Sequence, residues 1–313
     1  RPFLLDAEEV KKAPAAFKSI PATGDELKGL NFRIQTSPLD CTGCEVCVNV
    51  CPTQSLSMKP LTEVSEVEGK NWEYAMTLTN KGDRVDKTTV RGSQFQTPMI
   101  EFNGACAGCG ETQYMKMLTQ LFGSKLLLAD AMGCSMVWGG TSGLLPWTKD
   151  SKGYGPVYCS SLFEDNAEYG YGLVRANTVK RARLQSNVEA ALQSDASAEL
   201  KSTLQKWLDN KSDKAACDEL YEELKPMLAK EQSKPAVKAV QDYEDMLPVI
   251  TTWIYGGDGW AYDIGFGGLD HVLATGENVK MLVMDTEMYA NTGGQQSKAT
   301  QMSAVAKFAA GGK

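Results

Sequence analysis

Residues 247–259 read LPVITTWIYGGDG, and this stretch decides the fold. A continuous apolar run rich in β-branched and aromatic residues, ended by Gly and Asp, is typical of a strand buried on both faces of a parallel sheet. Two more runs share this character: KLLLAD at 125–130 and KMLVMDTE at 280–287. The segment between the runs at 247–259 and 280–287 has the apolar spacing and closing glycine of a helix; it reads YDIGFGGLDHVLATGEN, residues 262–278. The strand–helix–strand order predicts an α/β fold with a parallel sheet.

A glycine-flanked aspartate directly follows the predicted strand in the run that begins at Leu247. Gly257 and Gly259 permit close approach of the backbone to a diphosphate, and Asp258 supplies a carboxylate oxygen. Thr286 lies at the end of the next strand and supplies a second oxygen. Such oxygens can share a Mg2+ ion that bridges two phosphates. A plain strand–turn–helix loop is the alternative interpretation.

The sequence CTGCEVCVNVCP, residues 41–52, follows the C-x2-C-x2-C-x3-C-P spacing of bacterial iron–sulfur ferredoxins. Cys41, Cys44 and Cys47 are predicted to hold one [4Fe–4S] cluster, and Cys51 is predicted to reach a second. No other copy of the motif occurs in the chain, so we expect the missing ligands upstream of Arg1. A zinc knuckle is the alternative. The flanks NFRIQTSPLD and SLSMKPL alternate like short strands.

A second cysteine group is CAGCGE, at residues 106–111, joined later by Cys134 in DAMGCS. Cys106 and Cys109 alone would fit a redox dithiol or half of a zinc site. Because Cys134 ends a predicted strand, where α/β folds bind cofactors, the three thiols indicate another [4Fe–4S] cluster that lacks one ligand.

The remaining cysteines are poor candidates for that fourth ligand. Cys159 is expected to be a buried apolar residue, since free cysteine is often buried. Cys217 lies among charged residues and is expected to be a surface or interface thiol. We therefore expect the fourth ligand beyond Lys313.

Composition narrows the classes of function. A net charge of −7 disfavours a nucleic-acid partner, and a single histidine excludes most Cys/His zinc sites. Nine clustered cysteines indicate metal chemistry in a reducing compartment, and no apolar run is long enough to span a membrane. Both ends look cut, and AVAKFAAGGK at residues 304–313 looks like part of a helix.

A change in residue pattern near residue 98 divides the chain into two predicted domains. Residues 1–97 are predicted to form part of a small α+β ferredoxin-like domain with iron–sulfur clusters. Residues 98–313 are predicted to form the α/β domain with its parallel sheet and flanking helices. A stretch at about 173–246, rich in Ala, Lys, Glu and Leu, is predicted to be an inserted helical arm without chemistry of its own.

Four motifs together resemble one family. GDGWAYDIG, DTEMYANTGGQQSKAT, ACAGCGE and SLFEDNAEYGYG are similar to sequences of pyruvate:ferredoxin oxidoreductase, a thiamine-diphosphate enzyme with three [4Fe–4S] clusters. The likeness covers most of the chain and is weakest at residues 173–246. It implies that the α/β domain is a thiamine-diphosphate-binding domain.

The resemblance also implies roles for individual residues. Cys106, Cys109 and Cys134 would bind the cluster nearest the thiamine. Mg2+ would be held by Asp258, the Thr286 side chain and the Met288 carbonyl. Asn291 would lie near the reacting carbon as the catalytic residue. The cofactor-binding set would be Glu111, Cys134, Gly257, Asp258, Gly259, Trp260, Thr286, Glu287, Met288, Tyr289, Ala290 and Asn291. Thr286 stands where many thiamine enzymes have asparagine.

The implied reaction is oxidative decarboxylation of pyruvate with coenzyme A to acetyl-CoA and CO2. The electrons would pass through the three clusters to ferredoxin or flavodoxin. The expected setting is a homodimer that includes further segments of the same enzyme, in the cytoplasm or in a reduced organelle such as a hydrogenosome. The isolated segment is expected to be inactive. Alternatives are another 2-oxoacid substrate, NADP+ as acceptor, or a non-catalytic iron–sulfur electron carrier.

Overall fold

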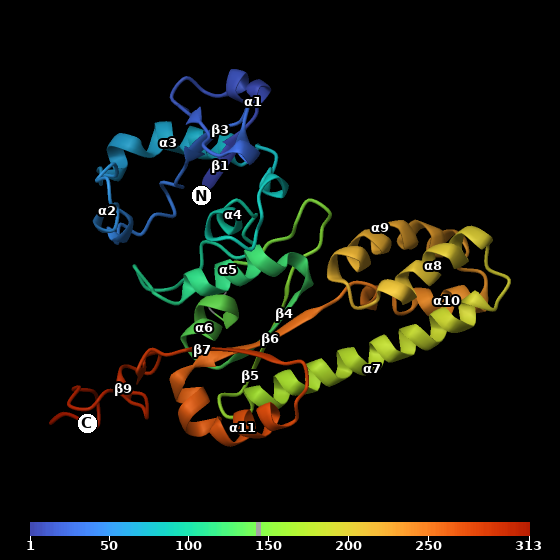
Figure 1. The fold of residues 1–313 in the computed structure, drawn as a ribbon. Coiled ribbons are helices and arrows are strands. Elements are labelled where there is room, and N and C mark those ends of the chain that lie inside the picture. The colour runs from blue at the N-terminus through green and yellow to red at the C-terminus, as the bar shows by residue number, and fades with distance from the viewer. Residues whose placement is uncertain (142–144) are drawn as a thin grey trace. The chain divides into compact units, whose positions relative to one another are not determined.

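A computed structural model describes residues 1–141 and 145–313. The chain forms two compact units (Figure 1), the first made of residues 1–124 and 137–156, the second of residues 125–136 and 157–313. Among the described residues, no helix is both long and apolar enough to cross a membrane.

The first unit combines a small antiparallel sheet with short helices. Strand β3 (Asn31–Ile34) lies between β1 (Pro2–Leu5) and β2 (Ile20–Pro21). The other elements of the unit are α1 (Ala7–Lys12), η1 (Asp25–Leu27), α2 (Val46–Asn49), α3 (Leu61–Ala75), η2 (Gly82–Arg84), α4 (Val90–Gln94), α5 (Thr112–Phe122) and the π-helical η4 (Val137–Thr141).

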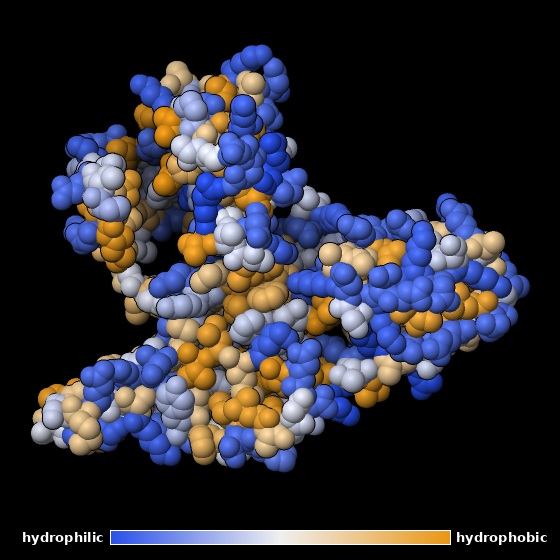
Figure 2. Space-filling view, viewed as in Figure 1, coloured by the Kyte–Doolittle hydropathy of each residue, from blue (hydrophilic) through white to orange (hydrophobic). Residues whose placement is uncertain are grey.

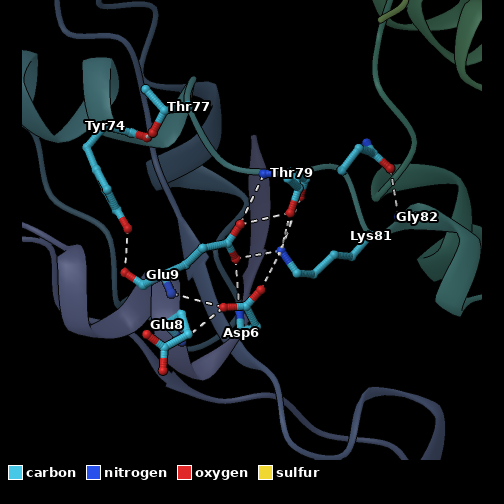
Figure 3. A network of polar contacts seen from close by, with 9 residues as sticks. Asp6, Glu8, Glu9, Tyr74, Thr77, Thr79, Lys81 and Gly82 are labelled. Carbon is cyan, nitrogen blue, oxygen red and sulfur yellow. Dashed lines mark hydrogen bonds and ion pairs between the residues drawn. The ribbon is translucent and has the colours of Figure 1, made fainter.

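A network of polar contacts ties α1 to the segment that follows α3 (Figure 3). Asp6 caps α1, and the Glu9 side chain accepts in return from the Asp6 backbone N–H, which completes a capping box. The Glu9 carboxylate also accepts from Lys81 Nζ at 2.5 Å and from Thr79 Oγ1 at 2.8 Å. Although burial raises the pKa of Glu9, the hydrogen bonds from Lys81, the Asp6 backbone and Thr79 together lower it to about 2.

The second unit is built on a four-stranded parallel sheet, which confirms the predicted α/β class. Its strand order is β5-β4-β6-β7. From β4 the chain passes to β5 on one side and then crosses to β6 on the other, so strand order reverses at β4. Ligands bind outside the carboxyl ends of strands at such a point. The strands are β4 (Leu126–Ala131), β5 (Val157–Ser161), β6 (Thr251–Gly257) and β7 (Lys280–Met284).

Helix α7 (Asn166–Leu192) lies against this sheet near its first turns. A Cβ atom on Gly170 would come within 2.4 Å of the Ile254 side chain, so only glycine permits this approach. Asn166 is fully buried and donates to the carbonyls of Ala129 in β4 and Tyr255 in β6. The core on this face is completed by Trp260, Ala261 and Val272 from the segments that follow β6.

Beyond the sheet, α7 continues into a helical arm with α8 (Ala198–Asn210), α9 (Lys214–Lys230) and α10 (Pro235–Gln241), and η5 (Glu244–Met246) leads back to the sheet. Figure 2 shows the surface over these helices as mostly hydrophilic. Trp207 and Leu204 are fully buried within the arm, because apolar residues recur there at helical spacing.

Arg181 fastens the arm at its base. Its Nη1 donates to the carbonyls of Met246 at 2.6 Å and Pro248 at 2.7 Å, and its guanidinium lies 5.5 Å from the ring centroid of Trp207. Cys217 is fully buried beside it, and this burial raises the pKa of the thiol. The expectation of a surface thiol was therefore wrong.

Two short helices flank β4: η3 (Gly123–Lys125) before it and α6 (Cys134–Met136) after it. Beyond β6 lie the π-helical η6 (Gly259–Ile264), α11 (Phe266–Ala274), and a short hairpin of β8 (Met288–Tyr289) and β9 (Gln295–Gln296). The predicted helix at 262–278 is thus confirmed in its central part.

Three other local expectations were wrong. Residues 55–60 form no strand, and the 15-residue helix α3 begins directly after them. The stretch 304–313 forms turns and bridges and no helix. Cys159 is half-buried in β5, at the edge of the sheet, instead of lying in the apolar core. The domain boundaries at 97/98 and about 173–246 stay predictions.

Candidate functional site

Three oxygen atoms converge where β6 and β7 end. Thr286 Oγ1 lies 2.8 Å from Asp258 Oδ1 and 3.1 Å from the carbonyl oxygen of Met288. Asp258 directly follows β6, and Thr286 comes shortly after β7, the neighbouring strand. Parallel strands bring their carboxyl ends to one edge, so residues far apart in sequence meet there.

These spacings fit a magnesium ion. Mg2+ binds oxygens at about 2.0–2.1 Å in octahedral geometry, which places adjacent ligands about 2.9 Å apart. The two spacings, 2.8 Å and 3.1 Å, are hydrogen-bond distances in this structure and lie on either side of that value. The donor set of a carboxylate, a hydroxyl and a backbone carbonyl is the hard-oxygen chemistry that Mg2+ prefers.

The Asp258 carboxylate is almost completely buried, at 1% exposure. Its second oxygen, Oδ2, accepts a hydrogen bond from Ser297 Oγ at 2.6 Å. Sequence reasoning missed Ser297, together with Thr300 and Asp263, which are tied to the same region. The observable signal was only polar residues in a glycine-rich loop, and this pattern does not distinguish a buried turn from an exposed one.

The segment after Thr286 forms a tight hairpin. Glu287 has φ of 61°, in the left-handed region, and this bend turns the Met288 carbonyl back toward Thr286. The turn between β8 and β9 carries Ala290 and Asn291, both exposed. Asn291, the predicted catalytic residue, is thus exposed to solvent, in the turn that follows Met288 in the sequence.

Residues of the predicted diphosphate loop divide into two kinds. Gly257 ends β6, and Gly259 begins η6. The Trp260 side chain is fully buried in the core with Ile254 and Ala129, so only its backbone could contact a phosphate.

Tyr289 fixes the hairpin against η6. Its ring covers Gly259, where a Cβ atom would lie 2.5 Å from ring carbon Cε1, and its hydroxyl donates to Asp263 Oδ2 at 2.7 Å. Burial, the hydrogen bond to Asp263 and the charges of Asp263 and Asp258 raise the pKa of Tyr289 to about 12. The phenol therefore remains a hydrogen-bond donor at neutral pH.

The four cysteines of the ferredoxin-like motif lie in one exposed loop around α2. Cys41, Cys44 and Cys47 are exposed, and Cys51 is half-buried. The Cys51 sulfur lies 3.6 Å from Thr53 Oγ1 and accepts from the Ser55 backbone at 3.3 Å, and these hydrogen bonds lower the pKa of the thiol.

Cys106 and Cys109 form a turn of the same unit. The Cys109 N–H donates to the Cys106 carbonyl at 3.0 Å. A Cβ atom on Gly108 would lie 3.4 Å from Val46 and 3.6 Å from Cys44 Cβ, so this turn packs against the first cysteine loop. Glu111, a predicted cofactor residue, is the N-cap of α5.

Cys134 belongs to the second unit and begins the short helix α6 (Cys134–Met136) after β4. The next residue, Ser135, donates to the fully buried Asp130 at 2.6 Å, and Tyr158 donates to the other oxygen of Asp130 at 2.8 Å. Desolvation of Tyr158 and the adjacent Asp130 charge raise the pKa of its phenol.

In the part of the chain that the structure describes, no group of three or more His, Cys, Asp or Glu side chains is arranged to hold a metal ion. The oxygen cluster at Asp258 contains only one acidic side chain and is a different kind of site. The cysteine loops supply thiols at the spacing of an iron–sulfur motif, and the assignment of individual cysteines to clusters stays a prediction.

Two family models match parts of the chain. Residues 34–57 match a 4Fe-4S binding domain, and residues 180–235 match the insertion domain of pyruvate-ferredoxin oxidoreductase. The second match lies within α7, α8 and α9 and the start of α10.

Curated relatives match the whole chain. It is 48% identical over 321 residues to "Pyruvate:ferredoxin oxidoreductase" of Moorella thermoacetica, covering 100% of this chain and 27% of the relative. It is 46% identical over 315 residues to "Pyruvate-flavodoxin oxidoreductase" of Klebsiella pneumoniae, with the same two shares. This chain is homologous to a segment of the pyruvate:ferredoxin and pyruvate:flavodoxin oxidoreductases.

A further relative of this chain carries a different name. "Pyruvate dehydrogenase [NADP(+)], mitochondrial" of Euglena gracilis is 50% identical over 317 residues, covering all of this chain and 17% of the relative. The chain thus spans about a quarter or less of the length of these relatives. It corresponds to the part of such oxidoreductases that includes the 4Fe-4S binding domain and the insertion domain.

Proposed function

We propose that this chain is the segment of a pyruvate:ferredoxin or pyruvate:flavodoxin oxidoreductase that binds thiamine diphosphate with Mg2+ and carries iron–sulfur clusters. The observation that carries the proposal is the convergence of oxygens from Asp258, Thr286 and Met288 at the carboxyl edge of the sheet. The 4Fe-4S domain match in the same chain supports electron transfer as its second role.

In this proposal each residue has a physical task. Asp258 provides the anionic ligand, and its burial removes competing water. Thr286 and the Met288 carbonyl complete one face of the metal site. When bound, thiamine diphosphate supplies the chemistry that decarboxylates a 2-oxo acid. Gly257 leaves the backbone open to its phosphates, while Gly259 leaves room for the Tyr289 ring that holds the hairpin in place. Exposed Asn291 is the candidate to contact the substrate.

The cysteines are proposed to carry electrons away from this site. Cys106 and Cys109, with Cys134, would ligate the cluster nearest the thiamine, and the loop from Cys41 to Cys51 would ligate the others. Contact between the turn at Gly108 and the loop at Cys44 supports a short path between two of these groups. Ferredoxin or flavodoxin is the proposed acceptor and coenzyme A the acyl acceptor, within a homodimer in the cytoplasm or a reduced organelle.

A second candidate is transfer of the electrons to NADP+. The 50% identity to the relative named pyruvate dehydrogenase [NADP(+)] favours it. The groups named above do not by themselves select between a protein and a nucleotide as acceptor, so the test compares both kinds of acceptor.

The test uses the intact purified protein. Pyruvate and coenzyme A are supplied with ferredoxin, flavodoxin or NADP+, and reduction of each acceptor is measured, with 2-oxoglutarate as the competing substrate. We expect pyruvate-dependent reduction that is lost in Asp258→Asn and retained in Asp270→Asn, which changes an exposed aspartate of α11. With Mg2+ present, thiamine diphosphate at a hundred times its dissociation constant should raise the free energy of unfolding of the wild type by about 2.7 kcal/mol.

Reduction of an acceptor without any 2-oxo acid dependence, together with no stabilisation by thiamine diphosphate, would leave the chain as an electron carrier and contradict the enzymatic proposal.

A further inference from the structure

The turn after β9 is polar in sequence and buried in structure. Ser297 is 3% exposed and Thr300 is 6% exposed, in a segment whose neighbour Lys298 is exposed. Buried hydroxyl groups are normally hydrogen-bonded, and the partners of these two show what the turn does.

Ser297 hydrogen-bonds to the buried Asp258 carboxylate, at the oxygen outside the oxygen cluster. Its Oγ donates to Asp258 Oδ2 at 2.6 Å, while Thr286 Oγ1 donates to Asp258 Oδ1 at 2.8 Å. One hydrogen bond to each oxygen restrains rotation of the Asp258 carboxylate about its Cβ–Cγ bond. Oδ1 is the oxygen in the cluster with Thr286 and Met288, so the bond from Ser297 sets which oxygen a cation would meet.

Thr300 acts on the other side of the cluster. Its Oγ1 donates to the Glu287 carbonyl at 2.6 Å and accepts from the Ser297 backbone N–H at 2.9 Å. Glu287 is the left-handed residue that turns the Met288 carbonyl toward Thr286. The Thr300 hydroxyl therefore holds the backbone bend on which the carbonyl ligand depends.

The same turn is fastened to η6 through its backbone. The Lys298 N–H donates to Asp263 Oδ1 at 3.1 Å, and the other carboxylate oxygen accepts from the Tyr289 hydroxyl. One four-residue turn, Ser297–Thr300, thus bonds to Asp258 after β6, to the Glu287 carbonyl between β7 and β8, and to Asp263 in η6.

We propose that Ser297 and Thr300 are positioning residues for the metal, which hold the Asp258 carboxylate and the Met288 carbonyl in the orientation that binds Mg2+. The proposal rests on the proposed function. Residues that orient metal ligands through hydrogen bonds change metal affinity by about 10- to 100-fold when they are substituted.

The experiment measures the apparent dissociation constant of Mg2+ in the intact protein, after removal of divalent cations with a chelator, by calorimetric titration in saturating thiamine diphosphate. Ser297→Ala removes the donor to Oδ2, and we expect affinity for Mg2+ to fall about 10- to 100-fold. Ser297→Thr keeps the hydroxyl and should recover most of that affinity. Thr300→Val keeps the shape of the side chain, removes its hydroxyl, and should also weaken Mg2+ binding.

Ser135→Ala is the matched control. Ser135 is 4% exposed and donates to a different buried aspartate, Asp130, at 2.6 Å. The Ser135→Ala variant loses the same kind of bond, in the same unit, as Ser297→Ala. Its Mg2+ affinity should stay within twofold of the wild type even if its melting temperature falls as much as that of Ser297→Ala.

Equal Mg2+ affinity in wild type, Ser297→Ala and Thr300→Val overturns the inference and leaves the proposed function intact. A fall in Ser135→Ala as large as that in Ser297→Ala also overturns it, because general destabilisation would then explain both. A wild type that binds neither Mg2+ nor thiamine diphosphate refutes the proposed function, and the inference falls with it.

Discussion

Replacement of Gly259 by alanine tests the packing on which the candidate site depends. The added Cβ would lie 2.5 Å from Cε1 and 2.8 Å from Cδ1 of the Tyr289 ring. Carbon atoms in contact prefer about 3.5–4.0 Å, so the ring must move by about 1 Å. It cannot move freely, because its hydroxyl is bound to Asp263 at 2.7 Å and its ring packs beside Phe163 at a centroid distance of 5.9 Å.

Overpacking of this kind costs about 1–3 kcal/mol. For a domain of this size, each kcal/mol lowers the melting temperature by roughly 2–4 °C, so we expect Gly259→Ala to melt about 2 to 12 °C below the wild type. Displacement of Tyr289 should also shift the adjoining Met288 carbonyl, and the stabilisation by Mg2+ with thiamine diphosphate should shrink. Differential scanning calorimetry of the intact protein, with and without these ligands, measures both effects.

Gly267→Ala is the control for the loss of a glycine. Gly267 lies in α11 with nothing within 4 Å of an added Cβ. Alanine there should stabilise the protein by about 0.5–1 kcal/mol, since glycine is costly inside a helix. If Gly259→Ala melts at or above the temperature of Gly267→Ala, the packing of Tyr289 on η6 does not restrain the site, and the reasoning is refuted.

Two further predictions concern the arm and the first unit. Trp207→Ala should destabilise the protein by about 3–5 kcal/mol because it empties a fully buried site, whereas Lys206→Ala, at an exposed neighbour, should change the melting temperature little. Because the pKa of Glu9 is lowered from 4.5 to about 2, its stabilising contribution is present above pH of about 4.5 and is lost as the pH falls through about 2. Lys81→Met should therefore lose helical circular dichroism at a higher pH than the wild type, while Lys70→Met, at an exposed ion pair, should not; identical acid transitions in all three proteins would contradict the role of the network.

Sequence predicted the buried strands well and the exposed ones poorly. Strands β4 and β6 are mostly buried apolar runs, so burial marks them in composition. Strand β7 has the same apolar composition, although most of its residues are only half-buried at the other edge of the sheet. Strand β5 was missed because VYCSS is short, polar and half-exposed at the edge of the sheet. Helix α3 was missed because its sequence is mostly polar, and only Asn71 and Ala75 are buried in it.

The alanine-rich stretch 304–313 shows the opposite error. Its composition favours a helix, but a short helix is marginal unless an apolar face is buried. Val305 and Phe308 are 72% and 90% exposed, so no such face is covered, and the segment forms turns.

The candidate site was predictable where it depends on strand ends. Asp258 and Thr286 follow neighbouring strands, and the edge of a parallel sheet brings them together. Ser297 was not predictable, because its contact spans 39 residues and follows no periodic pattern. Only the folded chain shows that this hydroxyl and Asp258 meet.

The attachment of the arm through Arg181 has a consequence for protein engineering. This one side chain belongs to the helix that leaves the sheet and bonds to carbonyls of the segment that returns to it, Met246 and Pro248. The entry and exit of the arm are therefore locked together at its base, so changes in length at the far end need not be transmitted to β6. The turn between α8 and α9 is part of this anchored base, because Arg181 also donates to the Lys211 carbonyl. The exposed residues Gln232 and Ser233, between α9 and α10, are accordingly a suitable position for grafting a fluorescent reporter domain.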